Sequence, residues 1–228
     1  MIKENIIKIN ERIAAACLKA GRDPALVAIV CVSKGRPAND IKEALAAGMR
    51  DIGESRIQEA LKKLDNIRNT NYGVRLHMIG HLQTNKAKEA VRIFDLIQSV
   101  DTIRLASEID KQAALINKVQ DILIEVNTSG EEQKYGFSPG DMFAAIKQIS
   151  SFKNIKIIGL MTVGPLGGDL VQARFCFRQL RELRDKLDEQ RTTNDERLVL
   201  SMGMSDDFEA AIEEGSNMVR LGRVIFEG

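Results

Sequence analysis

Lys34 is the residue whose position in this sequence most clearly suggests chemistry. It directly follows an apolar run at residues 26–33 that is rich in β-branched side chains and is typical of a strand buried on both faces. A lysine at the end of such a strand lies at the rim of a core, where partial desolvation lowers the pKa of the ammonium group. The neutral amine can then form a Schiff base with an aldehyde. The alternative is that Lys34 simply ends the strand and reaches into water, and the strand alone favours neither interpretation.

Small and polar residues after the last two predicted strands suggest an anion site. Ser201, Gly203 and Ser205 offer hydroxyl and backbone N–H donors, and Gly222 allows a close approach of the backbone to a ligand. Asp206 is expected to cap the helix that follows. Each glycine taken alone is better explained by a tight turn. Together with the amine they favour phosphate, because closed parallel barrels often bind phosphate in the loops after strands seven and eight.

An amine and a phosphate site that share one opening suggest a phosphorylated aldehyde, and pyridoxal 5′-phosphate (PLP) is the common example. The ring nitrogen of PLP needs a partner, for which Arg220 at the end of the last strand is the candidate. Arginine donates hydrogen bonds and cannot accept the pyridinium proton, so it would weaken the ring as an electron sink. The sequence therefore predicts mild Schiff-base exchange, or at most racemisation.

Three other polar residues are weaker candidates. His77 lies within a predicted strand, where a hydrogen-bonded core histidine is expected, and His81 could be a base, although a surface position is expected. Glu125 lies inside the fifth strand and would need an arginine or lysine partner. No two carboxylates stand out as an acid–base pair, and no grouping of His, Asp and Glu has metal-ligand spacing, so no metal is expected.

The elements that must position these residues alternate between strand and helix. The predicted strands are residues 26–33, 50–53, 75–79, 94–98, 121–126, 155–160, 197–200 and 217–221. The predicted helices are residues 4–20, 37–47, 55–66, 83–91, 102–117, 139–149, 169–190 and 206–213. This order favours an α/β fold, a single closed (β/α)8 TIM-like barrel in which the additional N-terminal helix replaces an incomplete last helix. We expect one domain over residues 1–228, with its site at the carboxyl ends of the strands.

The composition is that of an ordinary globular protein, with 44% apolar and 29% charged residues. A net charge of +1 gives no electrostatic case for nucleic acid or an anionic membrane, so neither is expected as a partner. Cys17, Cys31 and Cys176 are far apart, which favours a reducing compartment over a disulfide framework. The sequence has no signal-peptide pattern and no apolar stretch of membrane-spanning length. We therefore expect a cytoplasmic protein.

These segments, taken together, resemble the pyridoxal-phosphate homeostasis proteins, which are small relatives of the N-terminal barrel domain of alanine racemase. The resemblance runs through almost the whole chain, and so many segments in one order are more specific than any single motif. The segments are residues 32–34 (VSK), 52–59 (IGESRIQE), 77–86 (HMIGHLQTNK), 99–101 (SVD), 126–132 (VNTSGEE), 159–161 (GLM), 200–207 (LSMGMSDD) and 219–226 (VRLGRVIF).

The resemblance implies a set of cofactor-binding residues. Lys34 would hold PLP as a covalent aldimine, and Arg220 would face the ring nitrogen. The phosphate would be held by Ser201, Gly222 and the backbone N–H of Arg223, with Met202 and Ser205 lining the same corner. Ser55 stands at a cofactor-binding position where the family usually has Asn, and Arg223 replaces a residue that is usually small. The last residues, 226–228, also differ from the usual ending.

The function that the resemblance implies is PLP binding in intracellular vitamin B6 homeostasis, with no established catalytic residue. The expected partners are PLP, amino acids and PLP-dependent apoenzymes, and we expect a monomer. The alternative is a weak PLP-dependent amino-acid racemase that uses Lys34 with His81 or a cofactor-held water. A racemase of this type normally also needs a tyrosine from a second domain, and this chain has only Tyr72 and Tyr135. A Schiff-base aldolase without cofactor is a third interpretation.

Overall fold

The strands pair side by side in sequence order until the last one returns to the first. In the computed structural model, which describes residues 1–68, 71–165, 167, 169–190 and 197–227, eight parallel strands form this closed barrel. The strands are β1 (Ala28–Val32), β2 (Asp51–Glu54), β3 (Arg75–Met78), β4 (Leu96–Val100), β5 (Gln120–Glu125), β6 (Ile155–Met161), β7 (Val199–Ser201) and β8 (Met218–Leu221). The expected (β/α)8 barrel is confirmed.

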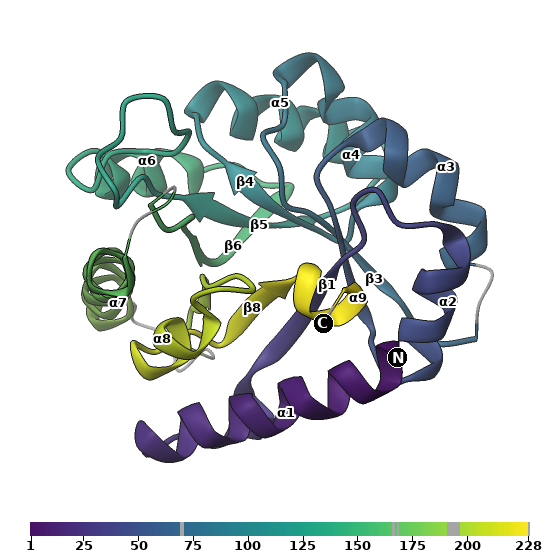
Figure 1. Ribbon diagram of the computed structural model, residues 1–228. Coiled ribbons are helices and arrows are strands. Elements are labelled where there is room, and N and C mark those ends of the chain that lie inside the picture. Colours follow the sequence, from purple (N-terminus) through teal and green to yellow (C-terminus); the bar gives the residue numbers. More distant parts are fainter. Residues whose placement is uncertain (69–70, 166, 168, 191–196, 228) are drawn as a thin grey trace.

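Helices surround the barrel (Figure 1). They are α1 (Ile2–Lys19), α2 (Ala38–Ala46), α3 (Ile57–Arg68), α4 (Ala87–Ile93), α5 (Ile103–Ala114), α6 (Met142–Ile149), α7 (Leu170–Gln190), α8 (Phe208–Glu213) and α9 (Arg223–Phe226), with short 3-10 helices at Pro24–Leu26 and Thr84–Lys86. The predicted boundaries differ from these by a few residues. For example, β1 begins at Ala28, because Asp23 caps the 3-10 helix at Pro24–Leu26 by accepting a hydrogen bond from the backbone N–H of Ala25.

The N-terminal helix α1 closes the ring of helices by packing against α8, α9 and α2 (Figure 1). Its buried face follows helical spacing through Ile6, Ile9 and Ile13. The side-chain amide of Asn5 donates a hydrogen bond to the carbonyl oxygen of Ile225 at 3.0 Å, so the first helix is joined directly to the last. The expectation that α1 fills the place of an incomplete last helix is therefore confirmed.

The inside of the barrel contains both apolar and polar side chains. An apolar cluster that is separate from the main core is formed by Val30, Leu96, Leu123, Met161 and Met218. Residues two apart on a strand face the same side of a sheet, so Gln98 in β4 and Arg220 in β8 share the inward face with Leu96 and Met218. The interior therefore brings polar groups to the axis of the barrel, where they need partners.

None of the helices in the part of the chain that the structure describes has the length and apolar character needed to span a bilayer. Among the same residues, no group of three or more His, Cys, Asp or Glu side chains could hold a metal ion. Cys17, Cys31 and Cys176 are free and buried, and burial raises the pKa of the Cys31 thiol to about 12.

Candidate functional site

A cavity of about 750 Å³ opens at the carboxyl ends of the strands. Its volume lies within the roughly 300–1,000 Å³ that small-molecule sites occupy. The structure brings six of the residues proposed from the sequence together in its lining: Lys34, Ser55, Ser205, Arg220, Gly222 and Arg223. Ser201 and Met202 are not part of that lining. Residues from the first, second, seventh and eighth strand ends thus meet at one opening.

Lys34 lies in a turn that directly follows β1. The backbone N–H of Arg36 donates to the carbonyl oxygen of Ser33 at 3.0 Å across this turn. Gly35 adopts a φ of +70°, and its N–H donates to Oε2 of Glu59 at 3.0 Å. The expected desolvation of Lys34 is wrong, because the turn carries the residue beyond the end of the strand and leaves it exposed. Its amine is available at the cavity mouth without being buried.

The turn rests on a buried ion pair that the sequence analysis missed. Nζ of Lys63 lies 2.7 Å from Oε1 of Glu54 and donates to the carbonyl oxygen of Ser33 at 2.6 Å. The hydroxyl of Ser33 donates to the same carboxylate oxygen of Glu54, whose side chain is fully buried. The signal available in the sequence was a lysine on the inner face of α3, four residues after Glu59. This pair holds the backbone that carries Lys34.

Arg220 presents a buried cation to the cavity. Its guanidinium donates to Oγ of Ser201 at 2.7 Å and to the carbonyl oxygen of Thr162 at 2.8 Å. Burial lowers the pKa of Arg220 to about 10, against the opposing effect of Glu125 and Asp207, so the group stays charged at neutral pH. A guanidinium has five N–H groups, and those not directed to Ser201 and Thr162 can serve a ligand.

Glu125 is the nearby buried carboxyl group for which the sequence analysis required a cationic partner. Burial, together with the nearby Asp101, raises its pKa to about 7, against the opposing effect of Arg220. Arg220 is thus the cation that favours the charged form of Glu125. It acts by electrostatic attraction, and no ion pair joins the two side chains among the described residues. Glu125 lines a smaller cavity of about 260 Å³ beside the main one.

Ser201 and Met202 are buried and do not line the cavity. The hydroxyl of Ser201 donates to Oε1 of Gln98 at 2.6 Å and accepts from Arg220, so it belongs to the barrel interior. Met202 is fully buried in the main apolar core, because neighbouring residues on an extended chain face opposite sides. Gly203, at a φ of +95°, then reverses the chain, and Met204 lines the cavity. The structure therefore places Met204, and not Met202, at this corner.

The end of β8 approaches the cavity through Gly222. A Cβ atom added there would lie 3.3 Å from the carbonyl oxygen of Val32, so a larger residue would need the neighbouring backbone to shift by a few tenths of an ångström. Arg223 forms an ion pair with Asp206 at the rim. The expectation that Asp206 caps α8 is wrong, because the residue before α8 is Asp207, which accepts a hydrogen bond from the N–H of Met204 at 2.6 Å.

The two histidines have different environments. His77 is buried and hydrogen-bonded on both ring nitrogens, as expected for a core residue. His81 is held by two contacts: its Nδ1 lies 2.8 Å from Oδ2 of Asp101, and its ring stacks on Tyr135 with centroids 3.6 Å apart. His81 and Lys34 both line a neighbouring cavity of about 530 Å³. The expected surface position of His81 is confirmed, because the residue is exposed.

Comparisons with known proteins agree over the full length of the chain. A sequence profile described as "Alanine racemase, N-terminal domain" matches residues 2–228. The pyridoxal phosphate homeostasis protein of Aquifex aeolicus is 43% identical over 223 residues, which cover 98% of this chain and 96% of that protein. The protein of the same name from Pseudomonas aeruginosa is 38% identical over 225 residues, which cover 99% and 94%.

Among solved structures, PipY of Synechococcus elongatus with PLP bound has a TM-score of 0.85 and 33% identity, covering 99% of this chain and 100% of that chain. Identity at this level over a complete chain is enough to establish the family. The chain belongs to the pyridoxal phosphate homeostasis protein family, and its barrel is of the alanine racemase N-terminal domain type.

Proposed function

We propose that this chain is a PLP-binding protein of intracellular vitamin B6 homeostasis, in which residues 1–228 form one domain and Lys34 holds the cofactor covalently. The observation that carries the proposal is the single cavity that joins the exposed amine of Lys34 to the buried cation of Arg220 and to Ser205 and Gly222. The PLP bound to PipY, a relative of the same length, supports the identity of the ligand.

Each lining residue has a proposed role that its chemistry allows. PLP supplies an aldehyde that reacts with amines and a ring that withdraws electrons. Lys34 supplies the amine, and the N–H groups of Arg220 face the ring nitrogen. Ser205, Gly222 and the backbone N–H of Arg223 bind the phosphate, while the adjacent Asp206 partly offsets the additional charge of Arg223. Ser55 lies at the same opening with a hydroxyl that can donate to the ligand.

Ser201 supports the site indirectly in this proposal. Its hydroxyl is engaged by Gln98 and Arg220, so its contribution is to hold the guanidinium and not to contact the phosphate. Met202 packs in the core and fixes the strand from which Ser205 follows. These roles differ from those that the resemblance implied for the two residues.

The exposure of Lys34 favours storage and transfer of PLP over catalysis. Attached to an amine in an open turn, the cofactor stays accessible to free amino acids and to PLP-dependent apoenzymes, which we propose as partners. Catalysis of proton transfer needs a positioned acid or base within hydrogen-bond reach on each side of the reacting atom. This chain supplies the Lys34 amine on one side of an open mouth.

Borohydride reduction of the PLP-loaded protein, followed by peptide mass spectrometry, tests the proposal. The reduced adduct is expected on Lys34, and Lys34→Ala is expected to lose the visible absorbance of the bound cofactor. Lys86→Ala is the matched control, because Lys86 lines the neighbouring cavity that Lys34 also borders. An adduct on Lys86 or Lys134 instead, or protein that stays colourless after incubation with PLP, would refute the assignment.

A second candidate function, weak amino-acid racemisation, is favoured by the His81–Asp101 pair at the same mouth. Such a pair resembles the oriented imidazole that general bases use. Incubation of the loaded protein with L-alanine or L-serine and chiral chromatography separates the two functions. Turnover that exceeds that of Lys34→Ala and falls in His81→Gln would establish the racemase, whereas equal rates in all three proteins support the binding protein.

A further inference from the structure

A chain of hydrogen bonds runs from Arg220 through the inside of the barrel toward its opposite end. Arg220 donates to Ser201 at 2.7 Å, and the hydroxyl of Ser201 donates to Oε1 of Gln98 at 2.6 Å. Nε2 of Gln98 lies 2.9 Å from Nδ1 of His77, and Nε2 of His77 lies 2.9 Å from Oδ1 of Asp51. All five side chains are buried. The groups come from strands β8, β7, β4, β3 and β2, so the chain crosses the barrel.

In this hydrogen-bond chain, each donor is directed away from Arg220 and toward Asp51. An amide nitrogen cannot accept a hydrogen bond, so Nδ1 of His77 must accept from Gln98 and the ring proton must be on Nε2. Nε2–H then donates to Asp51. At the other end, the hydroxyl hydrogen of Ser201 is committed to Gln98, which leaves the oxygen of Ser201 to accept from Arg220. With the amide of Gln98 in this orientation, the hydrogen bonds allow one proton placement.

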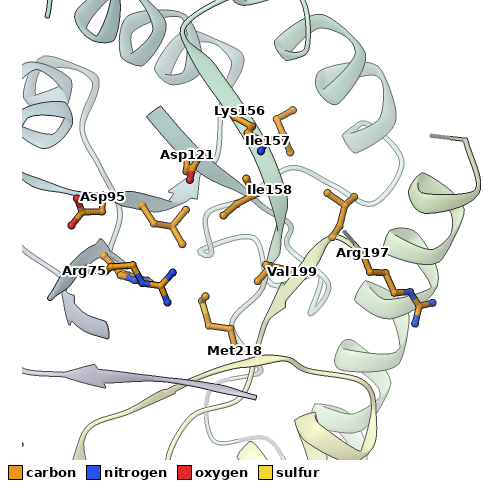
Figure 2. Close-up of a pocket in the computed structure, with 12 residues that line it drawn as sticks. Arg75, Asp95, Asp121, Lys156, Ile157, Ile158, Arg197, Val199 and Met218 are labelled. Carbon is orange, nitrogen blue, oxygen red and sulfur yellow. The ribbon is translucent and has the colours of Figure 1, made fainter. Parts of the chain in front are cut away.

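The hydrogen-bond chain ends on a carboxylate at the amino-terminal mouth of the barrel. Asp51 also accepts from the guanidinium of Arg75 at 2.8 Å. Burial alone would raise the pKa of Asp51, but its hydrogen bonds with His77 and Arg75 hold that pKa below the usual value. Arg75 and His77 line a cavity of about 480 Å³ at this mouth. Figure 2 shows Arg75 and Asp95 on one side of this cavity and Arg197 on the other.

We propose that Gln98 and His77 are positioning residues for the cofactor ring, acting through Ser201 on the guanidinium of Arg220. The inference rests on the proposed PLP function of this cavity. The fixed hydroxyl of Ser201 holds one side of the guanidinium, and the carbonyl oxygen of Thr162 holds the other, so the remaining N–H groups have a single orientation. Without Gln98, the hydroxyl of Ser201 is free to rotate and the guanidinium loses that orientation.

The first test is independent of PLP. The protein contains only two histidines, so ¹⁵N–¹H NMR correlations of the imidazole rings can be assigned with His81→Gln as reference. The ring proton of His77 is expected on Nε2. A proton on Nδ1, or a doubly protonated ring, would overturn the proposed chain. This measurement uses the folded protein and stays decisive even if core variants fail to fold.

The second test compares two buried glutamines. Gln98→Met breaks the hydrogen-bond chain. Gln120→Met removes an equally buried amide that donates to the carbonyl oxygens of Asp95 and Asp121 and forms none of the hydrogen bonds that lead to Arg220. Both variants are expected to lose stability. Only Gln98→Met should shift the absorbance maximum of bound PLP and weaken its affinity by about tenfold, which is the lower limit for the loss of groups that orient metal ligands. Identical spectra and affinities in the two variants would overturn the positioning role.

The two tests distinguish this inference from the proposed function. If PLP binds elsewhere than Lys34 while His77 still has its proton on Nε2, the function is wrong and the hydrogen-bond chain stands as a structural feature. If Lys34 carries PLP and Gln98→Met behaves like Gln120→Met, the function stands and the positioning role is wrong.

Discussion

Nζ of Lys63 lies 2.7 Å from a carboxylate oxygen of Glu54, and both groups hold the turn that carries Lys34. Replacing Lys63 by Met leaves a fully buried carboxylate without its cation, which costs about 3–5 kcal/mol in the free energy of unfolding. Urea unfolding measures this loss. Lys62→Met is the control, because Lys62 is exposed and its replacement should cost less than about 0.5 kcal/mol. Equal midpoints for the two variants would contradict the anchoring role of the pair.

Glu125 should make the stability of the protein depend on pH. Its pKa is about 7 in the folded protein and near 4.5 without burial, so the folded state binds the additional proton between these values. The free energy of unfolding therefore falls as pH rises through this window. Glu125→Gln removes the effect and should gain on the order of 2 kcal/mol relative to the original protein between pH 5 and pH 8.

Thermal unfolding at pH 5 and at pH 8 measures this gain. Glu132→Gln is the control, since Glu132 is exposed. If the melting temperatures of Glu125→Gln and of the unmodified chain stay parallel across the range, the raised pKa is incorrect.

Gly203 and Gly130 both have positive φ angles but differ in the space around them. At Gly203, with φ +95°, an added Cβ would lie 2.6 Å from the Cβ of Ala211, whereas at Gly130, with φ +71°, nothing lies within 4 Å. Gly130→Ala should therefore cost only backbone strain, about 1–2 kcal/mol, and Gly203→Ala should cost about 1–3 kcal/mol more. Denaturant unfolding compares the two. PLP affinity should fall only in Gly203→Ala, because Ser205 shifts with its turn; equal costs would show that the contact with Ala211 relaxes freely.

Asn5 and Asn10 lie on the same helix with different surroundings. Asn5 is buried and donates to the carbonyl oxygen of Ile225, and Asn10 is exposed. Asn5→Ala should cost about 1–3 kcal/mol because a buried acceptor is left unpaired, and Asn10→Ala should change stability by less than about 0.5 kcal/mol. Hydrogen exchange of α9 amides should rise in Asn5→Ala. Unchanged exchange there would mean that the bond does not hold the C-terminal helix.

The sequence predicted the barrel because a strand such as β1 is a local apolar run and because strands alternate with helices along the chain. It also located Lys34, Arg220 and Gly222, since the ends of parallel strands must gather at one mouth. Partners across the barrel could not be predicted in this way. Whether Gln98 meets Ser201 depends on how the strands are staggered around the closed sheet, which no single segment encodes.

Two errors have simple physical causes. Successive side chains on an extended chain face opposite sides, so a shift of one residue decides whether Met202 faces the core or the ligand. The sequence of residues 201–205 alone does not show which of its side chains face the ligand. The exposure of Lys34 depends on the turn at Gly35, whose positive φ carries the chain away from the strand end. Both are properties of the backbone path and not of residue type.

The contact of α1 with α8 and α9 also has a consequence for synthesis of the chain. At about 5–20 residues per second, ribosomes need roughly 10–40 s to reach the partners of the first helix. Throughout that time the part of the isoleucine face of α1 that packs on α8 and α9 has no native surface to cover it. The nascent protein therefore completes this part of its fold only once residues 208–226 are available, and protease should cut α1 in chains stalled before residue 208.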